Sequence, residues 1–416
     1  MVKSKENTVK TPSYYVRKRL WKNKPAIAGF IVIVLAHIIA ILGYLIMPDH
    51  TPNANDGSAL IKKKPIGFEC TLLKFRKNRE IERGNFLEKM YMGQESDFII
   101  QPVSSYQIKN LKVYYSLFGK EDETESADIV AVTKNLFVGS SPKLKPDSIY
   151  NYSVKDDVIT YLDLNEKTVQ ITREELLRDF LDHNIEKREY LLGTDKAGRD
   201  ILSRLLFGTR ISLSIGFISV LISILVGVTL GALSGFFGGT TDKFIMWLMT
   251  VVWSIPSIML VIAISLALQS RGVWVAFVAV GLTMWVEVAR VVRGQILSLK
   301  EKLYVEAAKA LGVGDLRIIF VHILPNIVGP LIVIATANFA SAILIEAGLS
   351  FLGLGVQPPM PSWGMMVNEG YGSMLAKDSG YLVVLPSLCI CILVLAFNLF
   401  GNGLRDAYDP QSAVKW

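Results

Sequence analysis

Residues 304–325 read YVEAAKALGVGDLRIIFVHILP, a short polar stretch between two long apolar segments. Most residues of 306–311 are good helix formers, and Gly312 tolerates the left-handed backbone that ends a helix. Asp315 is expected to cap a second short helix, which Pro325 is expected to stop. We therefore predict a helix-turn-helix in water at a membrane face, whose small side chains let another protein approach the backbone closely.

The chain has 416 residues, of which 51% are hydrophobic, and a formal net charge of +7. This composition indicates an integral membrane protein rather than one large soluble core. The basic residues crowd beside apolar segments, for example within residues 1–25, which fits the positive-inside rule better than nucleic-acid binding. Arg271 and Lys377 are the only lysine or arginine residues in the short segments expected outside. We predict no nucleic-acid partner.

Apolar runs long enough to cross a bilayer occur six times. They are residues 26–47, 211–237, 244–268, 273–292, 327–347 and 381–400, with a kink expected at Pro256 in the third. Six spans place both termini and the 304–325 stretch in the cytoplasm, and residues 49–210 outside. The predicted fold class is an all-α polytopic membrane protein with an inserted extracytoplasmic α+β domain.

The inserted region, residues 49–190, is polar and charged. Its β-strands are expected within runs of alternating apolar and polar residues, at 97–103, 108–119, 128–138 and 157–172. A helix is expected from residue 171 to 184, with Thr172 and Glu175 forming a capping box. No motif in this region indicates which ligand it binds.

An amphipathic helix is expected directly before the second span. Thr194 or Asp195 is the expected cap, with Ile201 and Leu205 on the apolar face and Arg199 and Arg204 on the opposite face. Such a helix lies along the membrane surface, and its charges are expected to be solvated.

Three motifs resemble ABC importer permeases of the C type, from the oligopeptide, dipeptide and nickel class. The Glu-Ala-Ala stretch resembles the loop that couples to the ATPase, and the resemblance implies that role for Glu306, Ala307, Ala308, Gly312, Asp315, Leu324 and Pro325. Residues 191–216 are similar to the permease signature, carried by Gly193, Thr194, Asp195, Gly198, Arg199, Asp200, Ser203, Arg204, Gly208 and Arg210. Residues 348–374 resemble a loop at the outer mouth, carried by Gly353, Gly355, Pro358, Pro361, Trp363 and Gly364. A packed extracytoplasmic loop is an equally open interpretation of the last stretch.

The resemblance implies a half-pore in a bacterial plasma (inner) membrane that passes peptides by alternating access. Its implied partners are a homologous second permease, two ATPase subunits that hydrolyse ATP, and an extracytoplasmic solute-binding protein. The chain itself is expected to bind no cofactor. The domains are predicted as 1–48, 49–190, 191–410 and a tail at 411–416. The 49–190 insert departs from the family, whose loop here is usually far shorter.

Two acidic residues fall inside the apolar segments. Glu287 is expected to pair with Arg290 one helical turn away, and Glu346 is expected to reach water at the outer end of the fifth span. The chain has no phosphate-binding Gly-x-x-x-x-Gly-Lys stretch and no catalytic or metal-ligating constellation, so we predict that it is not an enzyme. A membrane receptor or scaffold that merely anchors the 49–190 region is one alternative, and a secondary transporter is a further one.

Overall fold

The computed structural model describes residues 12–139, 141, 151–270, 272–374 and 379–409. The basic residues before position 12, Arg271, Lys377 and the predicted tail at 411–416 lie outside the described residues. The chain divides into two compact units. We call the described parts of Met1–Ala40, Gly208–Asn368 and Val383–Trp416 the helical unit, and Ile41–Phe207 with Glu369–Leu382 the mixed unit.

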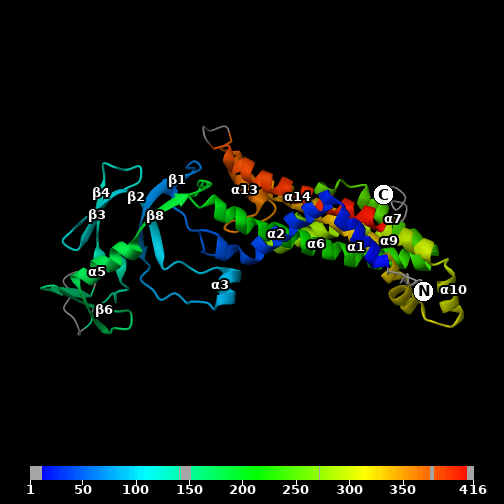
Figure 1. Ribbon diagram of the computed structural model, residues 1–416, viewed down its shortest axis with the longest axis horizontal. Coiled ribbons are helices and arrows are strands. Elements are labelled where there is room, and N and C mark those ends of the chain that lie inside the picture. Colours follow the sequence, from blue (N-terminus) through cyan, green and yellow to red (C-terminus); the bar gives the residue numbers. More distant parts are fainter. Residues whose placement is uncertain (1–11, 140, 142–150, 271, 375–378, 410–416) are drawn as a thin grey trace, which may run out of the picture. The chain divides into compact units, whose positions relative to one another are not determined.

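Long apolar helices dominate the helical unit (Figure 1). The helices of the chain outside the sheet region are α1 Pro12–Lys22, α2 Lys24–Ile46, α6 Ile201–Phe237, α7 Gly239–Trp253, α8 Ser257–Ala267, α9 Val273–Leu299, α10 Leu303–Ala310, α11 Asp315–Arg317, α12 Val328–Phe351, α13 Trp363–Tyr371 and α14 Tyr381–Tyr408. A π-helical turn, η3 Ile318–Ile323, and a 3-10 turn, η4 Leu324–Ile327, join α11 to α12.

Within the described residues, five helical segments are long and apolar enough to cross a membrane. They are α2, α6, α9, α14 and the continuous run Asp315–Phe351. The bent pair α7 and α8 forms a sixth if it counts as one span, since its two halves meet at 95°. Pro256 precedes the first residue of α8, so the predicted break lies at the expected proline.

The predicted surface helix before the second span is wrong as a separate element. Residues 201–237 form one helix of 37 residues, α6, that includes the predicted second span. Ile201, Ser203, Arg204 and Leu205 are all buried, so the start of α6 has no solvated face. Both the apolar and the polar side of this part of α6 contact other parts of the protein. A helix lying on the membrane surface would instead expose its polar side to water.

Two antiparallel sheets lie in the mixed unit (Figure 1). The larger has the order β4-β3-β2-β1-β8 and the smaller β5-β6-β7. The strands are β1 Phe68–Arg76, β2 Phe98–Lys109, β3 Lys112–Leu117, β4 Thr124–Asp128, β5 Tyr152–Lys155, β6 Val158–Leu162, β7 Thr168–Thr172 and β8 Ile185–Tyr190. Asn110 and Leu111, both with positive φ, form the tight turn between β2 and β3.

Short helices lie before and between the strands of the mixed unit. They are η1 Ala59–Ile61, α3 Phe86–Met92, α4 Ile129–Thr133, α5 Arg173–Asp179 and the π-helical turn η2 Phe180–Asn184. Of these, α4, α5 and η2 pack against the sheets. The predicted capping box at the start of α5 is confirmed, because Thr172 Oγ1 accepts from Glu175 N and Glu175 Oε2 accepts from Thr172 N.

The predicted strand at 128–138 is wrong, because its first half is helix α4. Ile129, Val130 and Val132 are all buried in the main apolar cluster of the mixed unit, with Leu73, Phe180 and others. A single helical turn places these β-branched side chains in the core, so packing overrides their strand preference.

Phe180 is fully buried in this cluster, whereas its neighbour Leu181 is 47% exposed. We expect Phe180→Ala to destabilise the mixed unit by about 3–5 kcal/mol, because it removes a large side chain and leaves a cavity. Leu181→Ala is the matched control and should change stability little. Pulse proteolysis of the full chain in detergent, over a urea series, measures both variants. Equal midpoints for the two would contradict this packing.

Candidate functional site

The 304–325 stretch folds as two short helices joined by a Gly312 turn. After α10 the amide of Gly312 donates to Lys309 O at 2.9 Å and the amide of Val313 donates to Ala308 O at 3.1 Å. These two bonds form a Schellman motif, which needs a left-handed residue at Gly312. Its φ is +75°, so the predicted role of this glycine in the turn is confirmed.

One face of this segment packs against the membrane helices. Val305 and Ala308 of α10 and Ile318, Ile319 and Ile323 of η3 are buried in one apolar cluster. The same cluster contains residues of α6 and α9, namely Ala232, Phe236, Val288, Val292 and Ile296. The segment is therefore attached to two long helices by side-chain packing, in addition to the chain itself.

The other face is exposed and apolar. Leu303 and Leu311 are 82% and 83% exposed, and Leu316 and Phe320 are also exposed. An exposed apolar patch of this kind marks a surface for another protein or for a membrane. We call these four residues the coupling face; in Figure 1, α10 lies at one end of the helical unit.

The predicted site residues of this segment divide between the two faces. Glu306, Ala307 and Asp315 are exposed, whereas Ala308 is only 7% exposed. The prediction that Ala308 lets a partner approach is therefore wrong, because this alanine faces the apolar cluster. Lys309 Nζ lies 5.0 Å from the centre of the Phe236 ring, so its charge is held over an aromatic face.

Two further expectations for this segment are wrong. Gly314, not Asp315, occupies the cap position of α11, and Asp315 begins the helix without a side-chain cap bond. The helix does not stop at Pro325, because Leu324 and Pro325 begin η4, which leads directly into α12. A proline is tolerated at the first turn of a helix, where its missing N–H needs no partner.

The signature residues before α6 form a compact turn that needs glycine at two positions. Gly193 has φ +79° and Gly198 has φ +77°. A Cβ on Gly193 would lie 2.4 Å from Lys64 O, and one on Gly198 would lie 1.9 Å from Ser58 O. Thr194 Oγ1 accepts from Lys64 N at 2.9 Å and donates to Ile61 O. The turn is thereby bonded to residues 58–64.

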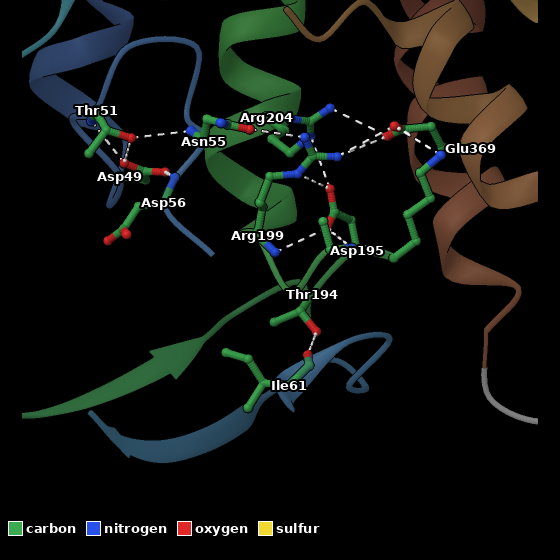
Figure 2. A network of polar contacts seen from close by, with 12 residues as sticks. Asp49, Thr51, Asn55, Asp56, Ile61, Thr194, Asp195, Arg199, Arg204 and Glu369 are labelled. Carbon is green, nitrogen blue, oxygen red and sulfur yellow. Dashed lines mark hydrogen bonds and ion pairs between the residues drawn. The ribbon is translucent and has the colours of Figure 1, made fainter. Parts of the chain in front are cut away.

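Four charged side chains converge beside this turn (Figure 2). Arg199 Nε lies 2.7 Å from Asp195 Oδ2, and Arg204 Nε lies 3.3 Å from the same oxygen. Glu369 Oε2 accepts from Arg199 Nη2 at 3.2 Å and Arg204 Nη2 at 3.4 Å. All four side chains are at most 8% exposed. We call Asp195, Arg199, Arg204 and Glu369 the charge cluster.

The charge cluster corrects the expectation that these charges are solvated. Lone buried charges are costly, whereas paired and hydrogen-bonded ones are tolerated. Asp195 also caps its own turn, since its Oδ1 accepts from the amides of Ala197 and Arg199. Arg199 Nη1 donates to Asn55 Oδ1 at 3.0 Å. The arginines thus hold three chain segments together.

Asp200 and Ser203 bond to the segment that follows α2. Asp200 Oδ2 accepts from Ser203 N at 2.8 Å and from its hydroxyl, while Ser203 Oγ accepts from Asp49 N at 2.9 Å. Asp200 therefore caps the start of α6, instead of the predicted Thr194 or Asp195. Burial raises the pKa of Asp200 above its ordinary value, since desolvation outweighs the bonds from Ser203.

The loop after α12 is packed around Ser350, a buried serine in the last turn of α12. Ser350 Oγ donates to Glu346 Oε1 at 2.7 Å and accepts from Val356 N at 3.2 Å. A Cβ on Gly355 would lie 2.2 Å from Ser350 Oγ. Ser362 Oγ accepts from Met365 N at 3.2 Å, which caps the start of α13. Glu346 is 1% exposed, so the expectation that it reaches water is wrong.

The remaining predicted residues of this loop differ in burial. Pro361, Trp363 and Gly364 are buried, whereas Gly353 and Pro358 are exposed. A Cβ on Gly364 would lie 2.6 Å from Ala347 Cα, so α13 packs closely on α12. The ring of Trp363 lies against Gly208, where a Cβ would be 2.8 Å from Trp363 Cδ1. Signature and loop motifs therefore meet at this pair. Arg210, two residues further along α6, is half-buried.

A cavity of about 520 Å³ lies at the break between α7 and α8. Its polar lining includes Glu287, Ser257, Thr283 and Ser341. The predicted Glu287–Arg290 pair is wrong: no ion pair joins them in the described chain, and the Arg290 guanidinium lies 3.6 Å from the Trp253 ring centre. Glu287 lies at the middle of α9, because α9 extends to Leu299.

Sequence reasoning missed several residues of these sites. Glu369, Asn55 and Asp49 complete the polar contacts around α6, and Ser350 and Ser362 organise the loop. Glu369 gave a signal in the sequence, since it is the only charged residue between Glu346 and Lys377. In the described residues, no group of three or more His, Cys, Asp or Glu side chains is arranged to hold a metal ion.

Comparison with known proteins places these features in a family. Residues 227–413 match the model for the binding-protein-dependent transport system inner membrane component. Residues 11–65 match the model for the N-terminal TM domain of oligopeptide transport permease C. Most of the sheet region therefore lies between the two matched ranges.

Three relatives agree with these matches. The glutathione transport system permease protein GsiD of Pectobacterium atrosepticum is 46% identical over 220 residues, which cover 53% of this chain and 72% of the relative. The oligopeptide transport system permease protein OppC of Bacillus subtilis is 40% identical, covering 54% and 72%. The dipeptide transport system permease protein DppC of Haemophilus influenzae is 45% identical, covering 53% and 74%. The chain thus belongs to the family of binding-protein-dependent transport system inner membrane components.

Proposed function

We propose that this permease forms half of a peptide pathway in an ABC importer. The relatives carry names of glutathione, oligopeptide and dipeptide permeases, which supports peptides as the substrate class. The second half of the pathway is a homologous permease, and an extracytoplasmic solute-binding protein delivers the solute. The assembly lies in a bacterial plasma (inner) membrane.

Residues 303–325, which we call the coupling segment, have two different faces, and this observation carries the proposal. The buried face packs on α6 and α9, and the coupling face is exposed. Two ATPase subunits hydrolyse ATP, and one of them binds the coupling face, with Glu306 and Ala307 at the contact. Closure of the ATPases then moves α10 and η3, and the apolar cluster passes this movement to the membrane helices.

The orientation follows from charge. Arg17, Lys18, Arg19, Lys22 and Lys24 precede or begin the first span, which favours a cytoplasmic amino terminus. Both termini and the coupling segment then lie in the cytoplasm. Residues 49–190 form an extracytoplasmic α+β domain, inserted between the first span at 1–48 and the permease core at 191–410.

The cavity at the α7–α8 break lies along the pathway in this proposal. Glu287 is an exposed carboxylate at mid-helix that lines it. Acidic residues within membrane helices usually face a partner or a watery path. The Glu287 carboxylate therefore attracts the ammonium group of a passing peptide, while Arg290 is held over Trp253.

Gly312→Val should uncouple ATP hydrolysis from uptake. A β-branched residue is strained at φ +75°, so the turn between α10 and α11 changes. Gly314→Val is the matched control, because Gly314 has φ −64° and a Cβ on either glycine would meet no atom within 4 Å. ATPase activity and dipeptide uptake are measured together in proteoliposomes of the complete importer. Normal coupled uptake by Gly312→Val would count against the proposal.

Glu287→Gln should lower uptake of dialanine about tenfold while the importer still hydrolyses ATP. The reason is loss of a charged contact, which contributes about 1.5–3 kcal/mol. Glu287→Asp keeps the charge and should retain most of the uptake. N-acetyl-dialanine lacks the ammonium group, so its uptake should respond less to Glu287→Gln. Unchanged dialanine uptake in the Gln variant would remove Glu287 from the pathway.

A further inference from the structure

Helix α3 of the mixed unit has no buried residue. Phe86, Leu87, Tyr91 and Met92 are each between 63% and 68% exposed. A seven-residue helix is marginal in water without packing, and here its large apolar side chains face away from the protein. Exposed aromatic and aliphatic side chains gathered on one short helix mark a surface that contacts a membrane or another protein.

The local structure keeps α3 helical in spite of this exposure. Asn85 and Glu88 form a capping box, with Glu88 Oε2 accepting from Asn85 N at 2.8 Å. Gly93 ends the helix at φ +78°, and its amide donates to Lys89 O at 3.1 Å. Leu87 and Tyr91 lie about one turn apart, and Phe86 lies about 100° from Leu87, so the three side chains fall within about 140° of the helix circumference. The helix is therefore amphipathic and held at both ends.

The position of α3 is set by contacts with the last turn of α2. A Cβ on Gly93 would lie 2.7 Å from Tyr44 Cε1 and 2.8 Å from His50 O. Gln94 N donates to His50 O at 2.9 Å. Lys89 lines a groove of about 460 Å³ together with Tyr44 and Leu45. These residues all belong to the mixed unit, so α3 is attached beside the end of the first span.

The end of α2 is itself a surface for lipid. α2 is apolar enough to cross a bilayer and stops at Ile46. Ile41, Leu45 and Ile46 are 56%, 45% and 53% exposed, as lipid-facing side chains are. Seven helical residues extend about 10 Å, so α3 remains close to that end of the span. The interfacial layer of a bilayer is about 5–8 Å thick on each side, which α3 reaches.

We propose that α3 is an interfacial anchor that inserts Phe86, Leu87 and Tyr91 into the bilayer surface at the end of α2. Its apolar side chains enter the boundary between headgroups and acyl chains, as those of interfacial amphipathic helices do. Tyr91 suits this depth, since its ring is apolar and its hydroxyl is polar. The anchor holds the sheet region against the membrane, and it depends on neither the substrate nor the direction of transport.

Spin labels test this placement on the full chain. The three cysteines, Cys70, Cys389 and Cys391, are replaced by alanine, and a cysteine is introduced for labelling at Leu87. The protein is reconstituted alone into vesicles of phosphatidylethanolamine and phosphatidylglycerol. Power saturation then compares the access of oxygen, which concentrates in lipid, with that of a water-soluble nickel chelate. Leu87 is 68% exposed, so the label should not disturb folding.

Two matched sites serve as references. Ile41 is an exposed residue of α2 and reports lipid, while Asn165 is an exposed residue between β6 and β7 and reports water. We expect the label at Leu87 to favour oxygen over the nickel chelate, as at Ile41 and opposite to Asn165.

Three results would overturn the proposal. One is access at Leu87 equal to that at Asn165. A second is spin–spin broadening at Leu87 that grows as lipid is reduced, which would indicate a second copy of the chain on α3. A third is a label that becomes shielded only after partner proteins are added, which would indicate a protein-docking helix.

Discussion

Apolar packing between the coupling segment and the membrane helices is the interaction on which the proposed transport mechanism depends. Val305, Ala308 and the isoleucines of η3 share one buried cluster with residues of α6 and α9. Closely packed side chains transmit displacement, because the interior of a protein has few voids and low compressibility. A coupling segment tied only by its two chain ends would move without the spans. The π-helical turn at Ile318–Ile323 and the 3-10 turn after it continue this connection into α12.

A different interaction orders the start of α6. Arg199 and Arg204 are buried, and each contacts Asp195 and Glu369. Removing one partner from a buried pair typically costs about 3–5 kcal/mol, since the other charge is left without compensation. The charge cluster therefore constrains the mixed unit where the chain leaves β8 and begins α6. The glycines at 193 and 198 allow the tight approach of the turn to residues 58–64.

Local and periodic features could be predicted from the sequence. The long apolar runs, the Pro256 break, the left-handed Gly312 and the Thr172–Glu175 capping box each depend on a few neighbouring residues, and the structure contains them. Features that depend on distant partners were mispredicted. The charges of the signature look solvated in sequence because Glu369 is 165 positions away from Arg204. Residues 128–138 look like a strand because apolar and polar residues alternate within them. The sequence does not reveal that their first half packs in one core with Phe180 and Leu73. Ala308 looks like a contact residue because the sequence does not reveal which side of α10 faces α6 and α9.

The side of the membrane on which the coupling face lies tests the central claim most directly. A single cysteine at Leu311, 83% exposed, is introduced into the cysteine-free chain and treated with a membrane-impermeant maleimide. The account predicts labelling in inside-out vesicles and protection in right-side-out vesicles. Labelling from the outer side of intact right-side-out vesicles would contradict it, because no cytoplasmic ATPase could then reach α10.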